Sequence, residues 1–323
     1  MLSGFDPERP GKHLYEIPVP RGVAAEVVGE TLCCIRNGEG PSVVLTGGIH
    51  GDEYEAQIVL RALAASIEAH EVTGRLIIVP SLNFPASQAG RRVAAPDGKN
   101  MNRVFPGNAA GTPTEQLAAI LGVDLFALAD LLIDAHAGGR DATVVPMVFG
   151  FSSERCKVGP AALARILEAW GYLYIEHVQG IASTACGAAL GAHIASVEIE
   201  GGGGGRLDPR ELAIMRDGIL RGLAASGVLA PRLAPITFQG VHLSVGAENQ
   251  VLAPASGLVE HLCGLGDIVA TGQVIARLHP LAGAGADAID IPCPKEGHIL
   301  RQTNSVHVAQ GQFVANTGSL RHA

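Results

Sequence analysis

The sequence is poor in aromatic residues and in positive charge. Phe, Trp and Tyr together make up 4% of its 323 residues, and 23 Lys and Arg residues are outnumbered by 31 Asp and Glu residues, which gives a formal net charge of -8. The basic residues form no cluster and are not interleaved with aromatic residues. Nucleic-acid-binding proteins usually present such a basic surface. The composition therefore argues against a nucleic-acid partner and favours a small-molecule substrate.

Signals for export, for membrane insertion and for cysteine chemistry are also missing. Residues 1–7 contain neither the basic nor the apolar segment of a signal peptide, so a cytoplasmic location is expected. Residues 178–197 carry no Asp, Glu, Lys or Arg, but their Ala, Gly, Ser and Thr side chains are too weakly apolar for a bilayer. The six cysteines show no CxxC spacing and are expected to be free thiols without a catalytic role.

Buried strands and amphipathic helices alternate through most of the chain. The apolar runs typical of strands buried on both faces are 43–45, 76–79 and 131–133. Helical patterns are found at 53–70, 114–128, 160–169 and 209–225. This order predicts an α/β fold in which helices cover a largely parallel sheet. Beyond residue 235, short alternating runs separated by Gly, Pro and Asp predict a smaller all-β domain, so we expect one domain at 1–235 and a second at 236–323.

A His and a Glu stand three residues apart at the end of the first buried run. They are His50 and Glu53, in the sequence TGGIHGDE at 46–53. Catalytic zinc sites usually have three protein ligands, and two His with one Glu is a common set. Open α/β sheets bind ligands beyond the carboxyl ends of their strands, so the third ligand is expected at another strand end. His136 closes the strand predicted from residue 131, and we predict that it completes the metal site.

Three motifs in this order resemble the succinylglutamate desuccinylase/aspartoacylase family of the zinc-carboxypeptidase-like fold. They are GGIHGDE at 47–53, NMNRVFPG at 100–107 and DAH at 134–136. Within the family, the sequence looks most like the branch that contains N-alpha-acetyl-diaminobutyrate deacetylase. The resemblance covers nearly the whole chain, including the glycine run at 201–205 and the β-rich C-terminal part. It implies a mixed sheet with helices on both faces and one zinc ion per subunit, and it favours a homo-oligomer.

The resemblance also implies an activity and further site residues. The activity is that of a zinc-dependent amidohydrolase that removes a short acyl group, most often acetyl, from the amine of a small amino acid such as N-acetyl-diaminobutyrate. Asn102 and Arg103 match the family pair that holds the substrate carboxylate, and a planar guanidinium suits that role. The family uses another Arg to polarise the scissile carbonyl. Arg91 and Arg92 lie upstream in the same loop, and Arg92 is favoured.

The general base of the family is a Glu at a strand end, just before glycines. Here both Glu198 and Glu200 precede the glycine run at 201–205. Alternation along a strand points both side chains to the same face of the sheet. Aligning the glycines with the Asp-Pro pair at 208–209 favours Glu200 as the base. One inserted residue in the glycine run would make Glu198 the base instead.

The sequence departs from the family pattern at two positions. The family Asp that lies two residues before the Asn-Arg pair is Asn100 here, and the family Asp-Leu-His is Asp134-Ala135-His136. The first change leaves open which acceptor orients a zinc-binding His. Asp134 or a backbone carbonyl could take that role. The second change keeps an apolar residue and is expected to be harmless.

Other functions fit parts of the sequence. A metallocarboxypeptidase of the same fold would cut short peptides, and a desuccinylase or aspartoacylase would take another N-acyl amino acid. Residues 253–276 resemble a biotinyl/lipoyl-type β module, but Arg277 follows where a carrier protein needs a Lys, which argues against a non-enzymatic carrier. A diaminobutyrate substrate would also need an acidic partner for its second amine. Several acids are candidates, among them Asp97, Asp141 and Glu176, and the sequence does not choose between them.

Overall fold

The computed structural model describes residues 2, 4–94, 96–177, 181–281 and 287–321. The strands up to residue 203 are β1 (Gly11–Ile17), β2 (Glu30–Asn37), β3 (Ser42–Gly47), β4 (Gly74–Val79), β5 (Leu131–Ala135), β6 (Ala142–Phe151), β7 (Tyr174–His177) and β8 (Ala195–Gly203). The helices are α1 (Tyr54–Ser66), α2 (Phe84–Ala89), α3 (Pro113–Asp124), α4 (Pro160–Ala169), α5 (Ala185–Gly191) and α6 (Pro209–Ala225).

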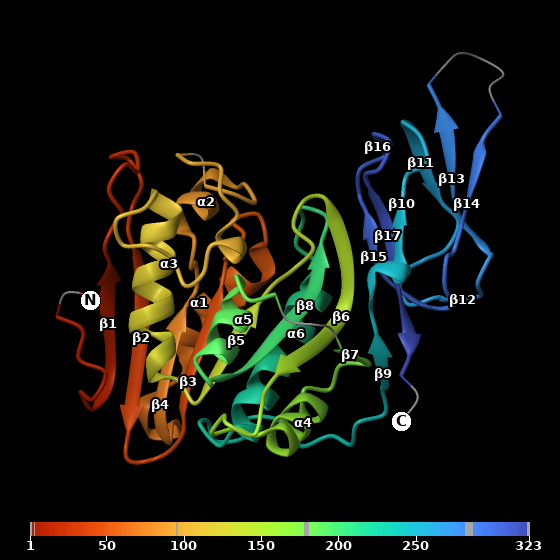
Figure 1. Cartoon of the computed structure of the whole chain (residues 1–323). Coiled ribbons are helices and arrows are strands. Elements are labelled where there is room, and N and C mark those ends of the chain that lie inside the picture. The colour runs from red at the N-terminus through yellow and green to blue at the C-terminus, as the bar shows by residue number, and fades with distance from the viewer. Residues whose placement is uncertain (1, 3, 95, 178–180, 282–286, 322–323) are drawn as a thin grey trace.

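Short strands make up the C-terminal part of the chain (Figure 1). They are β9 (Val241–Ser244), β10 (Gln250–Leu252), β11 (Gly257–His261), β12 (Ile268–Val269), β13 (Val274–Pro280), β14 (Ile289–Pro292), β15 (Gly297–Thr303), β16 (His307–Val308) and β17 (Phe313–Leu320). Thirteen of the strands form one sheet in the order β1-β2-β4-β3-β5-β8-β6-β7-β9-β17-β15-β12, with β10 paired to β17 outside this path. The other four form a second sheet in the order β14-β13-β11-β16.

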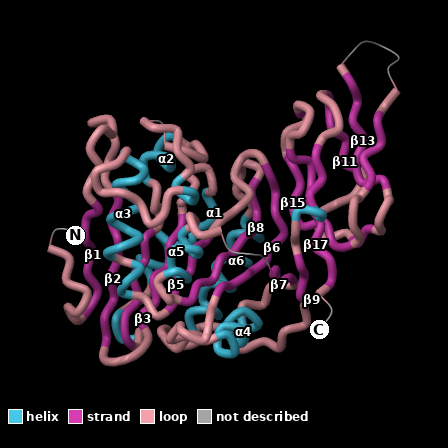
Figure 2. The backbone as a smooth tube through the Cα atoms, viewed as in Figure 1, coloured by secondary structure: helices cyan, strands magenta, loops and turns pink. Residues whose placement is uncertain are grey.

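The two faces of the main sheet pack into two separate hydrophobic cores. On β3, Val43 and Leu45 are buried together with side chains of α1, α4 and α6, whereas Val44 between them is buried with side chains of α3 and α5. This alternation is expected of a strand that is covered on both faces. The predicted mixed α/β sheet with helices on both faces is therefore confirmed (Figure 2).

The central strands place their carboxyl ends side by side. β4, β3, β5 and β8 are parallel, and the register sets Thr46 of β3 opposite Asp134 of β5, which in turn lies opposite Glu198 of β8. Residues that follow these strands therefore emerge at the same edge of the sheet. This edge brings together motifs that are far apart in the sequence.

Two of the four predicted helices have the predicted bounds, and the other two are shorter. The predicted helices at 160–169 and 209–225 match α4 and α6, and α6 is capped by the Asp208 side chain, which accepts the N–H of Arg210. The helices predicted at 53–70 and 114–128 are shorter in the structure. α2 and α5 were not predicted, because α2 is short and α5 consists of Ala, Gly, Cys and Leu without a polar face.

The C-terminal strands extend the main sheet as well as forming the second one. β9 pairs with β7, and β15 pairs with both β17 and β6. A separate hydrophobic core contains only residues between Val251 and Ala315. The predicted boundary between 235 and 236 lies in the segment that joins α6 to β9, and it stays a prediction.

The described residues also bear on the expectations about membrane-spanning helices and cysteines. No helix among them has the length and apolar character needed to cross a membrane. All six cysteines are free, and all except Cys263 are buried.

Candidate active site

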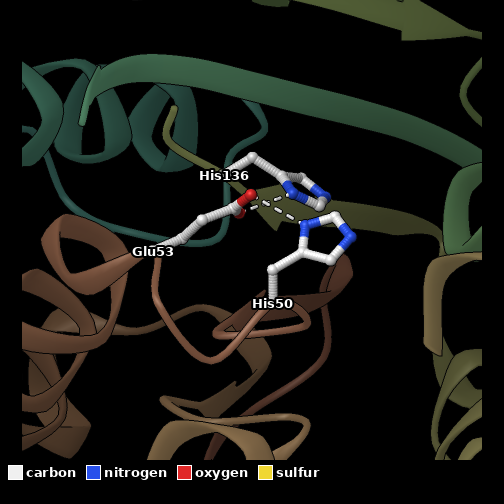
Figure 3. Close-up of side chains that lie close together, drawn as sticks. All are labelled: His50, Glu53 and His136. Carbon is white, nitrogen blue, oxygen red and sulfur yellow. Dashed lines mark hydrogen bonds and ion pairs between the residues drawn. The ribbon is translucent and has the colours of Figure 1, made fainter. Parts of the chain in front are cut away.

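His50, Glu53 and His136 converge beyond the carboxyl ends of β3 and β5 (Figure 3). Nδ1 of His50 lies 2.7 Å from Oε1 of Glu53, and Nδ1 of His136 lies 2.9 Å from Oε2 of the same carboxylate. The three side chains are buried, and one candidate ligand atom from each lies within 4.8 Å of the other two. The structure thus brings together the three residues that were predicted to bind the metal.

The second ring nitrogen of each histidine is held by a side-chain acceptor. Nε2 of His50 lies 3.1 Å from the amide oxygen of Asn100, and Nε2 of His136 lies 3.0 Å from Oδ2 of Asp134. The other oxygen of Asp134 accepts a hydrogen bond from the Thr46 hydroxyl at 2.8 Å. A proton on each Nε2 leaves Nδ1 free to act as a ligand. Asn100 is thus the acceptor for His50, and Asp134, one of the two predicted alternatives, is the acceptor for the other candidate ligand, His136.

This donor set fits a zinc ion. Two imidazole nitrogens and one carboxylate form a common catalytic ligand set. Burial alone would raise the pKa of Glu53, but His50 and His136 outweigh it and lower the pKa below the usual range. Burial opposes protonation of His136, yet Asp134 and Glu53 raise the pKa of His136 well above its usual value. The cluster therefore attracts positive charge, which a divalent cation can supply in place of protons.

The cluster lies in the wall of a cavity of about 610 Å³. The residues predicted for the site all line this cavity, namely His50, Glu53, Arg92, Asn102, Arg103, His136 and Glu200. The alternative base, Glu198, lines it as well. Arg91, the alternative to Arg92, is not among the lining residues. Phe149, Phe151 and Phe313 add apolar surface. A cavity of this size suits a small ligand rather than a macromolecule.

The loop between α2 and α3 supplies two cations to the cavity. Nη1 of Arg92 lies 3.1 Å from Oε1 of Glu53, so this guanidinium stands beside the candidate metal ligands. The amide oxygen of Asn102 accepts the N–H of Ala185 at 2.8 Å, which fixes the loop against the start of α5. Arg103 donates from Nη1 to the backbone oxygen of Asn102 at 2.6 Å. Both arginines can thus donate hydrogen bonds to a bound anion or to a carbonyl oxygen.

Glu198 and Glu200 face the cavity from the same side of β8, as their alternation predicted. Burial raises the pKa of Glu198 to about 7 and that of Glu200 to about 8. A carboxyl group that titrates near neutral pH can both accept and donate a proton. The charge of His136 acts on both carboxyl groups, so the electrostatics leave either one able to serve as the base.

Arg301 lines the same cavity and was not predicted. Its Nη2 atom lies 3.3 Å from Oε2 of Glu176 and 3.8 Å from Oε1 of Glu200. Arg301 belongs to β15 and lies opposite Val144 of β6 in the sheet. This pairing joins segments that are far apart in the sequence, so no local pattern around Arg301 could have indicated it.

The three acids considered for a second amine lie in different surroundings. Asp97 caps the start of α3, where its carboxylate accepts the N–H and the hydroxyl of Thr114 at 3.0 and 2.8 Å, and it does not line the cavity. Glu176 lines the cavity but is buried against Arg301. Asp141 lines it too, and its carboxylate forms no hydrogen bond or ion pair with any residue that the structure describes. Only Asp141 of the three is available to a ligand.

Comparisons with known proteins assign the chain to a family. Residues 39–226 match the family model of the succinylglutamate desuccinylase/aspartoacylase catalytic domain. N-alpha-acetyl-L-2,4-diaminobutyric acid deacetylase of Halomonas elongata is 33% identical over 287 residues, which cover 87% of this chain and 83% of the relative.

Solved structures resemble this chain over almost its full length. The product-bound ectoine utilization protein EutE (DoeB) from Ruegeria pomeroyi is 32% identical, with a TM-score of 0.88 and coverage of 98% of this chain and 97% of that chain. A succinylglutamate desuccinylase/aspartoacylase from Rhodobacter sphaeroides is 30% identical, with a TM-score of 0.89 and coverage of 99% and 98%. The chain belongs to the succinylglutamate desuccinylase/aspartoacylase family.

Proposed function

We propose that the protein is a zinc-dependent deacylase that removes the acetyl group from N-alpha-acetyl-diaminobutyrate or a closely related N-acyl amino acid. The observation that carries the proposal is the convergence of His50, Glu53 and His136 in the wall of a cavity lined by further carboxylates and arginines. The activity named for the relative from Halomonas elongata supports the choice of substrate.

The residues of the cavity divide the chemistry among them. Zinc bound by the three ligands would lower the pKa of a bound water to about 7 and polarise the substrate carbonyl. Glu200 accepts a proton as water attacks the amide carbon, and it returns the proton to the leaving amine. Arg92 stabilises the negative charge that develops on the carbonyl oxygen. Glu198 remains the alternative base.

Substrate orientation follows from the charges along the cavity. Arg103, with Asn102 beside it, binds the substrate carboxylate, because a guanidinium can donate two parallel hydrogen bonds to it. Asp141 binds the free side-chain ammonium of diaminobutyrate, because its carboxylate lines the cavity and forms no hydrogen bond or ion pair with the described residues. The acetyl amide between these two anchors is then presented to Glu200.

The charge of the cavity also separates this substrate from those of the related activities. Five carboxylates line the cavity, from Glu53, Asp141, Glu176, Glu198 and Glu200, against three arginines, Arg92, Arg103 and Arg301. Glu198 and Glu200 have raised pKa values, so the discrimination rests on Asp141, whose carboxylate repels the second carboxylate of a succinyl or aspartyl derivative and attracts an ammonium group. For a metallocarboxypeptidase, Arg301 and Phe313 of the C-terminal part restrict the space available to a long peptide.

The test combines metal analysis with turnover. We expect about one zinc per chain and release of acetate from N-alpha-acetyl-diaminobutyrate by the wild-type protein, with both lost in the His50→Ala variant. His279→Ala is the matched control, because His279 is half exposed and pairs with Glu260 on the outside of β13. Full turnover by metal-free protein would contradict the proposal, as would turnover of peptides without turnover of N-acyl amino acids.

A further inference from the structure

Arg301 reaches the candidate active site from outside the region that matches the catalytic family model. That region ends at residue 226, whereas Arg301 lies on β15. β15 is hydrogen-bonded to β6, and this pairing places the guanidinium in the wall of the cavity. The side chain of Arg301 is 21% exposed. A charged group this far removed from water requires nearby charged partners.

Two carboxylates from different strands face this guanidinium. Glu176 of β7, whose side chain is 2% exposed, lies 3.3 Å from Nη2 of Arg301. Glu200 of β8 lies 3.8 Å from the same nitrogen atom. The shorter contact is within hydrogen-bonding distance and the longer one is an ion pair without a hydrogen bond. Glu176 therefore anchors the guanidinium, and the guanidinium lies beside the proposed base.

The charged groups around Glu200 come from several elements. They are Arg301 of β15, His136 after β5, Glu53 before α1 and Glu198 of β8. Two of the four are negative, and His136 loses its charge when it is deprotonated or binds a metal. Arg301 is thus the one of the four whose positive charge does not depend on pH or metal.

We propose that Arg301 is a positioning residue for the general base, in which the anchor on Glu176 holds the guanidinium against the Glu200 carboxylate and keeps that carboxylate directed into the cavity. The inference rests on the proposed function, because it takes Glu200 as the base. It assigns to the C-terminal part a share in catalysis in addition to closing the cavity.

The charges predict a consequence that a merely structural ion pair would not have. Burial raises the pKa of Glu200 to about 8, and the positive charge of Arg301 opposes this rise. Removing the guanidinium therefore raises the pKa of Glu200 further, so that less of it is ionised at neutral pH. Glu176→Gln has the opposite effect, because its amide oxygen can still accept the hydrogen bond that holds Arg301 in place, while the loss of the competing negative charge lowers the pKa of Glu200.

The experiment compares Arg301→Met, Arg301→Lys and Glu176→Gln. We expect the acid limb of the kcat/KM profile to move to higher pH by about one unit or more in Arg301→Met, by less in Arg301→Lys, and to lower pH in Glu176→Gln. Arg277→Met is the matched control, since Arg277 of β13 is half-exposed and pairs with Asp290 at 2.9 Å. It should leave the profile unchanged.

A second readout uses metal-free protein and no substrate. Carboxyl 13C NMR of Glu-labelled protein, with Glu200→Gln to assign the signal, follows the titration of Glu200 directly, and circular dichroism checks that each variant folds. Unchanged titration in Arg301→Met, or shifts in the same direction for Arg301→Met and Glu176→Gln, would overturn the inference. If the wild-type protein hydrolyses no N-acyl amino acid, the proposed function fails, while the NMR result still decides whether Arg301 acts on Glu200.

Discussion

The amide oxygen of Asn100 accepts two hydrogen bonds, one from Nε2 of His50 at 3.1 Å and one from the backbone N–H of Asn102 at 2.9 Å. Two donors on one oxygen fix which way the amide faces. The same side chain thus orients a candidate metal ligand and starts the turn that carries Asn102 and Arg103. Metal binding and the proposed carboxylate anchor are linked through a single residue.

The first prediction concerns this link. Asn100→Ala should weaken zinc binding by about 10- to 100-fold, because His50 loses the acceptor that fixes its ring. Asn100→Asp keeps an oxygen at the same place and should retain wild-type affinity or exceed it. Competition with a chelator measures the affinities. Equal zinc affinity in all three proteins would show that Asn100 does not orient His50.

The second prediction separates the two candidate bases. Glu200→Gln should lower kcat by about 10²- to 10⁴-fold, since the amide cannot accept the proton, and should leave the zinc content unchanged. Glu198→Gln should retain more activity. Steady-state kinetics and elemental analysis of the same samples provide the comparison. A larger loss in Glu198→Gln would move the role of base to Glu198.

The third prediction concerns substrate recognition by Asp141. Asp141→Asn should raise KM for N-alpha-acetyl-diaminobutyrate by about two- to fivefold, a modest effect because an exposed ion pair contributes about 0.2–1 kcal/mol. N-acetyl-2-aminobutyrate lacks the side-chain amine, and its KM should not change. Kinetics with both substrates give the ratio, and a parallel rise for the two would remove Asp141 from recognition of the amine.

The fourth prediction concerns packing between α6 and Trp170. A Cβ atom at Gly222 would lie 1.9 Å from Cζ3 of the fully buried Trp170 ring, so Gly222→Ala should lower the free energy of unfolding by about 1–3 kcal/mol. Gly191→Ala in α5 is the control, because nothing lies within 4 Å of its added Cβ. Urea unfolding compares the two. Equal midpoints would show that the ring can move away without cost.

The fifth prediction concerns pH and stability. Hydrogen bonds from Arg232 lower the pKa of Glu71 to about 2, from 4.5. A lowered pKa stabilises the folded state above the unfolded value, and this contribution is lost as the pH falls from about 4.5 towards 2. Glu71→Gln should therefore cost up to about 1 kcal/mol at pH 7. The difference between the urea midpoints of the two proteins should be constant from pH 7 to about pH 5 and should shrink as the pH falls below about 4.5. A difference that stays constant down to pH 3 would contradict the assignment.

Local patterns indicated the three candidate metal ligands because the relevant geometry is local. His50 and His136 each follow a buried strand, and parallel strands align such ends without further information. The Glu pair of β8 followed from alternation in the same way. Two features required long-range contacts instead. The acceptor of His50 depends on how the loop between α2 and α3 folds back, and the place of Arg301 depends on the pairing of β15 with β6.

The pairing of β15 with β6 also limits how this enzyme family can be recombined. A chimera that joins residues 39–226 of one relative to the C-terminal part of another would combine the candidate metal ligands and the proposed base from the first parent with the position of Arg301 from the second. Such a protein could fold and bind zinc while the electrostatic environment of its base was mismatched. Residues 176, 200 and 301 should therefore be taken from the same parent when such a chimera is built.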